Sequence, residues 1–185
     1  MSELKQIRIC GFGGQGVILA GMILGYAAIK NGKWVAGSNA YGAQARGGSA
    51  RSEVIISREP IKFPHVLQSD ILITLSQSAY DEYIDKINKG GSIIIYDELM
   101  VAPHDLKVAK QIGVAATNTA IRELDNKQVA NIVILGASAA LTGIVTKEAL
   151  ISSIKENVQE RFKKLNLKAL NLGYALSENI FASLT

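Results

Sequence analysis

The sequence predicts an α/β fold of three layers, in which helices flank a largely parallel sheet that opens with a Rossmann-like βαβ unit. Three observations favour this class. A short apolar strand is followed by a glycine-rich turn and an apolar helix, further apolar strands alternate with a helical segment, and the pattern becomes wholly helical after residue 129. Residues 1–185 are expected to form a single domain, since this length fits one domain of ordinary size.

The first βαβ unit occupies the N-terminal part of the chain. Residues 7–10 are the expected first strand, and residues 11–16 are the glycine-rich turn. An apolar helix is expected over Val17–Lys30, closed by the Asn-Gly pair that follows it, because both residues tolerate a left-handed backbone. Residues 34–36 are predicted as the second strand, which completes the unit.

The next segments decide whether the sheet is parallel or mixed. A polar, glycine-rich loop is expected over residues 38–48 and a strand over residues 52–57, where the pattern alternates and then turns apolar. The connection is too short for a helical crossover, so this strand is predicted to run antiparallel, which makes a mixed sheet the alternative to a parallel one. Ile71–Thr74 is a further strand.

One more helix and two more strands complete the expected sheet. A helix capped by Ser78 is expected to run to the paired glycines Gly90 and Gly91. Residues 92–96 are almost continuously apolar, which is typical of a strand buried on both faces. Residues 114–116 are the expected last strand.

The remainder of the chain is predicted to be helical. Residues 129–141 are almost wholly apolar and indicate a buried helix. Thr146 is the expected cap of the next helix, with Glu148 in its first turn, where the helix dipole favours an anion. Apolar residues recur over residues 165–176 and indicate the final helix.

Composition excludes several kinds of site. Cys10 is the only cysteine, so the chain cannot form an internal disulfide or supply the ligands of a four-cysteine iron–sulfur cluster. His65 and His104 lie far apart without ligand spacing, and neither pairs locally with an acid. Asp97 and Glu98 follow a strand, where a strand-end turn is favoured over an acid pair. We therefore expect no metal site and no catalytic residue here, and no oxidoreductase activity of the chain alone.

Charge and hydropathy favour a cytoplasmic location. The net charge is +4, but the basic residues are spread along the chain without interleaved aromatic residues, so nucleic acid is not an expected partner. The longest apolar run, residues 16–29, is too short and too rich in glycine to span a membrane. The N-terminus lacks the apolar core of a signal peptide.

Glycines in the first turn fit the G-x-G-x-x-G pattern between a strand and a helix, which is the context the pattern requires. Glycines let the backbone turn tightly and approach a ligand, and the free N–H groups of the helix start favour an anion such as phosphate. The amide of the glutamine in this turn adds a possible donor. The cofactor-binding residues predicted in the turn are Gly11, Gly13, Gly14, Gln15 and Gly16.

Two other interpretations of the turn stay open. A dinucleotide calls for an Asp or Glu about 20 residues further on, at the end of the second strand. Residues 35–39 contain no acid, and no arginine follows directly, which counts against a dinucleotide. Alternatively, the glycines only allow close packing of the helix on the sheet, or of a partner on the loop.

The polar loop contributes the remaining predicted binding residues. Arg46 is flanked by Gly47 and Gly48 and preceded by Tyr41, and these four residues are predicted to contribute to cofactor binding. A guanidinium presented in this way suits a phosphate, a carboxylate or a carbonyl group of a partner. The alternative is an exposed hairpin loop with a solvated arginine.

Five stretches occur in a characteristic order and cover nearly the whole chain: residues 11–17 (GFGGQGV), 41–48 (YGAQARGG), 54–57 (VIIS), 129–137 (VANIVILGA) and 166–174 (NLKALNLGY). In this order and spacing the chain resembles the gamma subunit of the 2-oxoacid:ferredoxin (acceptor) oxidoreductases. It departs from the family pattern at Ala43 and Gln44, where a proline and then an acidic or other polar residue are common. This difference bears on the expected conformation of the loop and not on the resemblance to the family.

The resemblance implies a role within a larger enzyme, with alpha, beta and ferredoxin-like delta subunits as partners. Thiamine diphosphate on other subunits attacks a 2-oxo acid and carbon dioxide leaves. Electrons pass through iron–sulfur clusters to ferredoxin or another acceptor, and coenzyme A takes the acyl group. In the family the equivalent domain is associated with the coenzyme A side of the site, which suits the glycine turn and Arg46.

The resemblance also favours a substrate. Pyruvate-type members often carry arginine at the position of Phe12, so the form found here is more similar to the 2-oxoglutarate or branched-chain types, of which 2-oxoglutarate is favoured. The competing function is a stand-alone nucleotide- or phosphate-binding regulatory module of Rossmann type.

Overall fold

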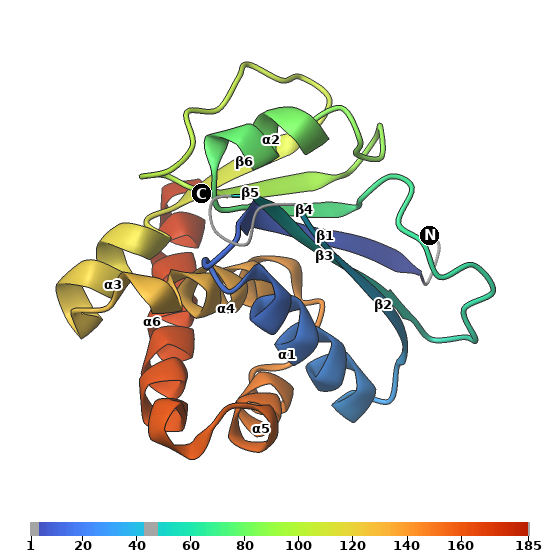
Figure 1. The fold of residues 1–185 in the computed structure, drawn as a ribbon. Coiled ribbons are helices and arrows are strands. Elements are labelled where there is room, and N and C mark those ends of the chain that lie inside the picture. The colour runs from blue at the N-terminus through green and yellow to red at the C-terminus, as the bar shows by residue number, and fades with distance from the viewer. Residues whose placement is uncertain (1–3, 43–47, 185) are drawn as a thin grey trace.

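Within residues 4–42 and 48–184, which the computed structural model describes, six strands form one sheet in the order β2-β3-β1-β4-β5-β6 (Figure 1). Strands β1, β4, β5 and β6 run parallel to one another. Strand β3 runs antiparallel to both of its neighbours, β1 and β2. The strands are β1 (Lys5–Phe12), β2 (Trp34–Tyr41), β3 (Ser49–Ser57), β4 (Ile71–Thr74), β5 (Ile93–Asp97) and β6 (Lys110–Val114).

The position of β3 makes the sheet mixed. A short connection joins β2 to β3, so the two strands form a hairpin, and β3 also pairs with β1 from Lys5 opposite Ile56 to Phe12 opposite Ser49. The predicted antiparallel strand is therefore confirmed. Because β1 and β2 are each antiparallel to β3, they run parallel to each other, as in a βαβ unit, but with β3 inserted between them.

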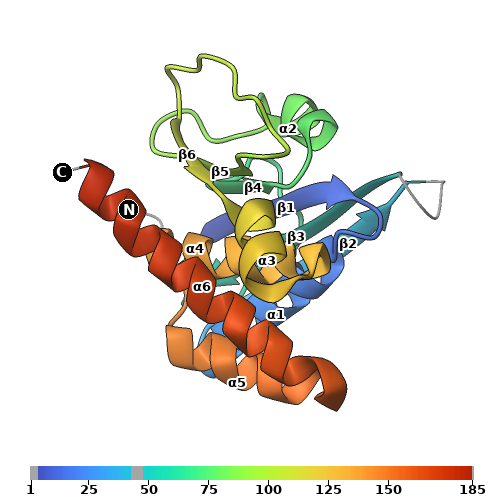
Figure 2. The same ribbon diagram turned by 90° about the vertical axis from the view of Figure 1, so that its left-hand side faces the viewer.

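Helices cover the two faces of the sheet unequally, which gives the three predicted layers (Figures 1 and 2). Only α2 lies on one face within the described chain, whereas the other helices form a thick layer on the opposite face. The larger apolar core lies between the sheet and this thick layer. The helices are α1 (Val17–Lys30), α2 (Gln77–Tyr83), α3 (Ala116–Leu124), the short η1 (Lys127–Val129), α4 (Ala130–Thr142), α5 (Lys147–Asn157) and α6 (Glu160–Leu184). No helix in the described part of the chain is long and apolar enough to cross a membrane.

The boundaries of β2 differ from the prediction. Strand β2 continues to Tyr41, so residues 38–41, which the sequence placed in a loop, belong to the strand. This stretch contains small polar residues with little preference for strands, but every residue of β2 is paired with β3. Pairing with a neighbouring strand overrides such weak local preferences.

The boundaries around α2 and β6 also need correction. Ser76, not Ser78, caps α2, with its hydroxyl accepting from the N–H of Ala79 at 3.3 Å, and the helix ends at Tyr83 rather than continuing to Gly90. Beyond the helix the chain pairs with the segment before β4 instead. The last strand ends at Val114, and the residues that follow begin α3, a helix that the sequence did not indicate.

Two predicted helices are confirmed with nearly the expected bounds. Helix α1 covers Val17–Lys30 as predicted, and α4 covers Ala130–Thr142, one residue later than expected. Thr146 caps α5 as predicted, since its hydroxyl accepts from the N–H of Ala149, and Glu148 lies in the first turn. Each of these helices carries its own local start signal or a long apolar pattern, which explains why the sequence located it.

Helices α4 and α6 cross at a pair of glycines. A Cβ placed on Gly136 would lie 2.6 Å from the carbonyl oxygen of Leu170. A Cβ placed on Gly173 would meet the carbonyl oxygen of Val133 and lie 2.8 Å from the nitrogen of Ala137. The backbones of the two helices are therefore in direct contact, which only residues without a side chain permit.

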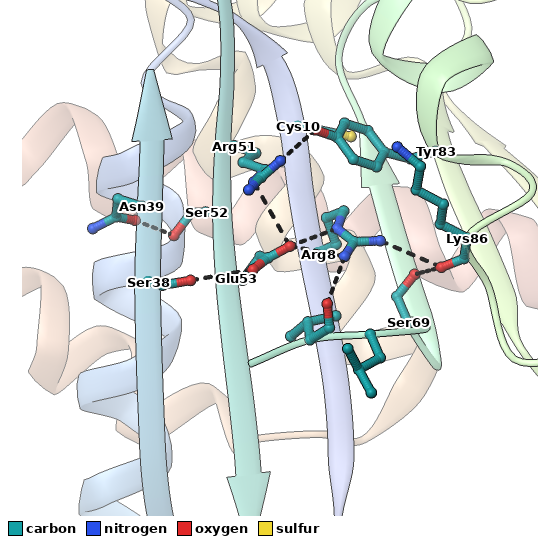
Figure 3. A network of polar contacts seen from close by, with 12 residues as sticks. Arg8, Cys10, Ser38, Asn39, Arg51, Ser52, Glu53, Ser69, Tyr83 and Lys86 are labelled. Atoms are coloured by element: carbon teal, nitrogen blue, oxygen red, sulfur yellow. Dashed lines mark hydrogen bonds and ion pairs between the residues drawn. The ribbon is translucent and has the colours of Figure 1, made fainter. Parts of the chain in front are cut away.

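A buried polar network fixes β1 from the α2 face of the sheet (Figure 3). The Nε of Arg8 donates to Oε1 of Glu53 at 2.9 Å, and the terminal nitrogens of Arg8 donate to the carbonyl oxygens of Val66 and Lys86 at 2.9 and 3.3 Å. The hydroxyl of Ser38 donates to the second oxygen of Glu53 at 3.1 Å. The network joins β1, β2 and β3 to the segments before β4 and after α2, and so positions the strand that leads into the glycine turn.

Candidate functional site

A cavity of about 380 Å³ opens at the carboxyl ends of the central strands. Its walls come from the end of β1 and the glycine turn, from residues just beyond β4 and β5, and from the starts of α3, η1 and α4. The residues that line this glycine-turn cavity are Phe12, Gly13, Gly14, Gln15, Leu75, Met100, Thr117, Lys127, Gln128 and Ala130.

The strand order explains why the cavity lies here. From β1 the sheet extends through β3 to β2 on one side and through β4 to β5 and β6 on the other. Open α/β sheets bind ligands at the carboxyl ends of their strands, where the strand order reverses in this way. Because β3 separates β2 from β1, the end of β2 does not flank the glycine turn, as the ribose-binding strand of a dinucleotide fold does. This geometry counts against dinucleotide binding.

The glycines of the turn have different roles. Gly11 and Gly16 are packed, because a Cβ on Gly11 would collide with the side chain of Gln15 and one on Gly16 with that of Asn131. Gly14 has a φ of 98°, and a Cβ on it would have no atom within 4 Å. The packing interpretation therefore applies to Gly11 and Gly16, whereas Gly14 combines a left-handed backbone with open space at the cavity.

The side chain of Gln15 fastens the turn to the sheet. Its Oε1 accepts from the N–H of Phe12 at 2.6 Å, and its Nε2 donates to the carbonyl oxygen of Leu75 at 2.8 Å. The amide thus joins the end of β1 to the residue that follows β4. Gln15 lines the cavity, as predicted for a binding residue, but its amide already holds the turn in shape.

The start of α1 gives the turn backbone groups that suit an anion. Its N-cap, Gly16, has a φ of 70° and provides no side-chain cap. The first N–H groups of any α-helix have no partner within the helix, and together with the helix dipole they favour a negative charge.

Lys127 and Gln128 are lining residues that the sequence did not indicate. Both belong to η1, whose start is capped by Asn126, with the side-chain oxygen of Asn126 accepting from the N–H of Gln128 at 2.9 Å. Lys127 is exposed and brings a positive charge to a cavity that faces the glycine turn. No local motif marks this lysine, because only the tertiary fold brings residues 127–128 beside the first turn of the chain.

A buried carboxyl group holds Thr117, one of the residues that line the cavity. Asp97, at the end of β5, accepts from both the hydroxyl and the N–H of Thr117, the latter at 3.0 Å, and so caps α3 from a distance. Burial raises the pKa of Asp97 above its usual value, and the hydrogen bonds from Thr117 and from the N–H of Leu99 oppose that rise. The expected strand-end turn is present, with this additional capping role.

The predicted loop residues are only partly described. The N–H of Gly13 donates to the carbonyl oxygen of Gly48 at 2.8 Å, so the end of the loop lies against the glycine turn as the prediction requires. Tyr41 is exposed and lines a separate, smaller cavity beside Arg51 and Tyr83. The predicted binding residues Arg46 and Gly47 lie outside the described residues.

Within residues 4–42 and 48–184 no group of three or more histidine, cysteine or acidic side chains is placed to hold a metal ion. Cys10 is fully buried, and burial raises the pKa of its thiol far above the usual value, as expected for an unreactive thiol. The polar side chains that line the glycine-turn cavity are the amine of Lys127, the hydroxyl of Thr117 and the amides of Gln15 and Gln128, between apolar walls.

The mixed sheet, with the glycine turn and its cavity at the carboxyl ends of the central strands, defines the architecture of this α/β protein. Residues 6–176 match the family model described as pyruvate ferredoxin/flavodoxin oxidoreductase, and the chain belongs to this family. It is a gamma-type subunit of the 2-oxoacid:ferredoxin oxidoreductases, which act as multi-subunit enzymes. The resemblance inferred from the five sequence stretches is confirmed.

Individual relatives agree with this assignment. The chain is 43% identical over 178 residues to the 2-oxoglutarate synthase subunit KorC of Methanocaldococcus jannaschii, and the match covers 95% of each chain. The gamma subunit of a keto/oxoacid ferredoxin oxidoreductase from Geobacter sulfurreducens is 39% identical, with a TM-score of 0.82 over 95% of this chain and 99% of that one.

A third comparison concerns the fold alone. A 2-oxoglutarate:ferredoxin oxidoreductase from Magnetococcus marinus, solved with 2-oxoglutarate, coenzyme A and succinyl-CoA bound, has a TM-score of 0.85 at 24% identity. The match covers 97% of this chain and 32% of that one. The same architecture therefore occurs there as one part of a longer chain.

Proposed function

We propose that this chain is the gamma subunit of an enzyme that oxidatively decarboxylates 2-oxoglutarate to the acyl-coenzyme A, and that it binds the phosphate part of coenzyme A in the glycine-turn cavity. The thiamine diphosphate and iron–sulfur chemistry belongs to the alpha, beta and ferredoxin-like delta subunits, which pass the electrons to ferredoxin or another acceptor. This chain holds and orients the acyl acceptor, in the cytoplasm.

One observation carries the coenzyme A proposal. Gly14 faces open space with a left-handed backbone at the start of α1, and Lys127 lines the same cavity. A helix start and an amine that converge on one space attract a phosphate from two directions. Phe12, Leu75 and Met100 give the cavity apolar walls for the uncharged part of the ligand.

The substrate proposal has separate support. The chain is 43% identical to a subunit of a 2-oxoglutarate synthase. Phe12 forms part of the cavity wall, so an arginine at this position, as in pyruvate-type members, would add a positive charge beside the ligand.

To test the proposal, an affinity tag is placed on this chain, and the complex that the tagged chain forms is purified from its native cell under anaerobic conditions. We expect thiamine-diphosphate and ferredoxin-like subunits to co-purify and 2-oxoglutarate to reduce the acceptor only when coenzyme A is present; preference for pyruvate would contradict the substrate.

Lys127→Ala is expected to raise the KM for coenzyme A about tenfold, since a charge-assisted hydrogen bond contributes about 1.5–3 kcal/mol and 1.4 kcal/mol corresponds to a factor of ten. The KM for the 2-oxo acid should not change. The matched control is Lys89→Ala, which removes an exposed lysine before β5, at the opposite end of the strands. The measurement is steady-state kinetics of the complete enzyme, and equal coenzyme A kinetics for the two variants would contradict the phosphate site.

Gly14→Ala tests whether the turn contacts the ligand or only keeps its own shape. Gly14 and Gly32 both have positive φ, and a Cβ added to either would lie in open space, but only Gly14 lines the cavity. Alanine at either position costs about 1–2 kcal/mol of backbone strain, so both variants should lose similar stability in denaturant titrations. Only Gly14→Ala should raise the KM for coenzyme A, on the order of tenfold. If Gly32→Ala raises it equally, the effect belongs to stability and not to the site.

A further inference from the structure

A second cavity, of about 260 Å³, adjoins the glycine-turn cavity. It lies between the start of α1, the η1–α4 segment and the first turns of α6. Gly14 and Gln128 line both cavities, so the two spaces meet at this pair of residues. The lining residues of this second cavity are Gly14, Gly16, Leu19, Asn126, Gln128, Val129, Asn131, Val158, Phe162, Leu165 and Asn166.

The second cavity differs from the first in its chemistry. The described residues that line it include no charged side chain, whereas Lys127 lines the first. Its polar groups are amides, and two of them belong to deeply buried residues, Asn131 and Asn166, which are 2% and 5% exposed. Such a surface does not attract an ion but suits a neutral polar group.

The buried amides leave acceptor atoms for a ligand. Asn131 donates through Nδ2 to the carbonyl oxygen of Gly16 at 2.9 Å, and Asn166 donates through Nδ2 to that of Phe162 at 2.8 Å. Among the described residues no donor is recorded for the Oδ1 of either side chain. These two amide oxygens can therefore accept hydrogen bonds from a ligand that brings N–H donors.

Phe162 adds a flat apolar surface. Phe162 lines the second cavity and is 43% exposed, and the guanidinium of Arg161 lies over one face of its ring, 4.6 Å from the centroid, so that a base would stack on the other face. An exposed aromatic ring beside amide acceptors suits an amino-bearing heterocycle, because the ring stacks on the base while the exocyclic amine donates to the amide oxygens.

We propose that the second cavity binds the adenine base of coenzyme A, while the glycine turn and Lys127 hold its diphosphate. This inference rests on the proposed function of the first cavity. In an adenine nucleotide a single ribose separates the base from the phosphates, and the two cavities are likewise adjacent at Gly14 and Gln128. Phe162 stacks on the base, and Asn131 and Asn166 accept from its amine.

The test compares two fragments of coenzyme A as competitive inhibitors of the complete enzyme: adenosine bisphosphate, which has the base, and phosphopantetheine, which lacks it. Phe162→Ala should weaken adenosine bisphosphate about tenfold, which is the usual loss when a stacked aromatic ring is removed. It should leave phosphopantetheine unchanged. Phe162→Tyr should retain normal inhibition by both, and Phe63→Ala, which removes an exposed ring in the segment between β3 and β4, is the control.

Lys127→Ala separates this inference from the proposed function, because it should weaken both phosphate-bearing fragments. If Lys127→Ala weakens both while Phe162→Ala weakens neither, the adenine site is wrong and the phosphate site stands. If neither fragment competes with coenzyme A and Lys127→Ala has no effect, the proposed function itself fails. If Phe162→Ala releases a partner subunit without changing inhibition by adenosine bisphosphate, the second cavity is part of a subunit interface and the inference is overturned.

Discussion

Gly173→Ala is expected to destabilise the protein by about 3 kcal/mol or more, although alanine is the better helix former. An added Cβ would meet the carbonyl oxygen of Val133 and approach the nitrogen of Ala137 to 2.8 Å, and both are backbone atoms of α4. Overpacking typically costs about 1–3 kcal/mol, and a contact with backbone cannot be relieved by a rotamer change, so the cost should lie at or above the upper end. The measurement is the free energy of unfolding from urea titration of the purified chain.

Gly25→Ala is the matched control for this substitution. Gly25 also lies inside a helix, α1, but its added Cβ would only touch a methyl group of Val35 at 3.6 Å, an ordinary contact. Here the helix preference of alanine should prevail, with a gain of up to about 1 kcal/mol. The two variants should therefore shift stability in opposite directions. Equal shifts would mean that the close crossing of α4 and α6 does not limit the size of residue 173.

Glu53→Gln is expected to cost about 3–5 kcal/mol, because it leaves a buried guanidinium without its counter-charge. Arg8 is 4% exposed, and its Nη2 lies 2.8 Å from Oε1 of Glu53. The other bonds of Arg8, to carbonyl oxygens of Val66 and Lys86, hold the guanidinium in place, so it cannot turn out to solvent when its partner is lost. Urea titration of the purified variant measures the loss.

The surface ion pair between Lys30 and Glu156 provides the comparison, with Nζ and Oε1 2.7 Å apart. Glu156→Gln should hardly change the free energy of unfolding in urea, since solvent screens an exposed pair. Replacing Arg8 and Glu53 together by apolar residues should recover part of the loss seen for Glu53→Gln, because no charge is then left buried. If Glu53→Gln is as stable as Glu156→Gln, the network does not fix β1.

The sequence predicted elements whose signals are local. The strand, turn and helix of the first unit follow one another within residues 5–30, and the apolar pattern and glycine turn mark each of them. The connection between β2 and β3 was correctly expected to reverse the chain, since it is too short for a crossover. By contrast, β2 extends to Tyr41 because it pairs with β3. The residues at the end of β2 have little preference for strands, so the sequence does not predict this extension.

For the same reason, the sequence indicated only the glycine-turn side of the candidate site. The glycine turn has a recognisable motif. Lys127 and Gln128 lie beside it only because of the way α4 packs, and no short sequence pattern predicts that packing. The start of α3 is likewise set by Asp97, which lies 20 residues before Thr117 in the sequence. Arg46 stays a prediction, because it lies outside the described residues.

The hydrogen bond from Asn131 to the carbonyl oxygen of Gly16 joins residues 115 positions apart. During synthesis the glycine turn leaves the ribosome long before α4 exists, so the nascent N-terminal half contains the motif without the cavity. Both cavities form only when the last third of the chain has docked. A ligand that binds there stabilises the finished fold alone, by mass action. Coenzyme A in the proposed site would therefore select completed subunits over truncated or half-folded chains.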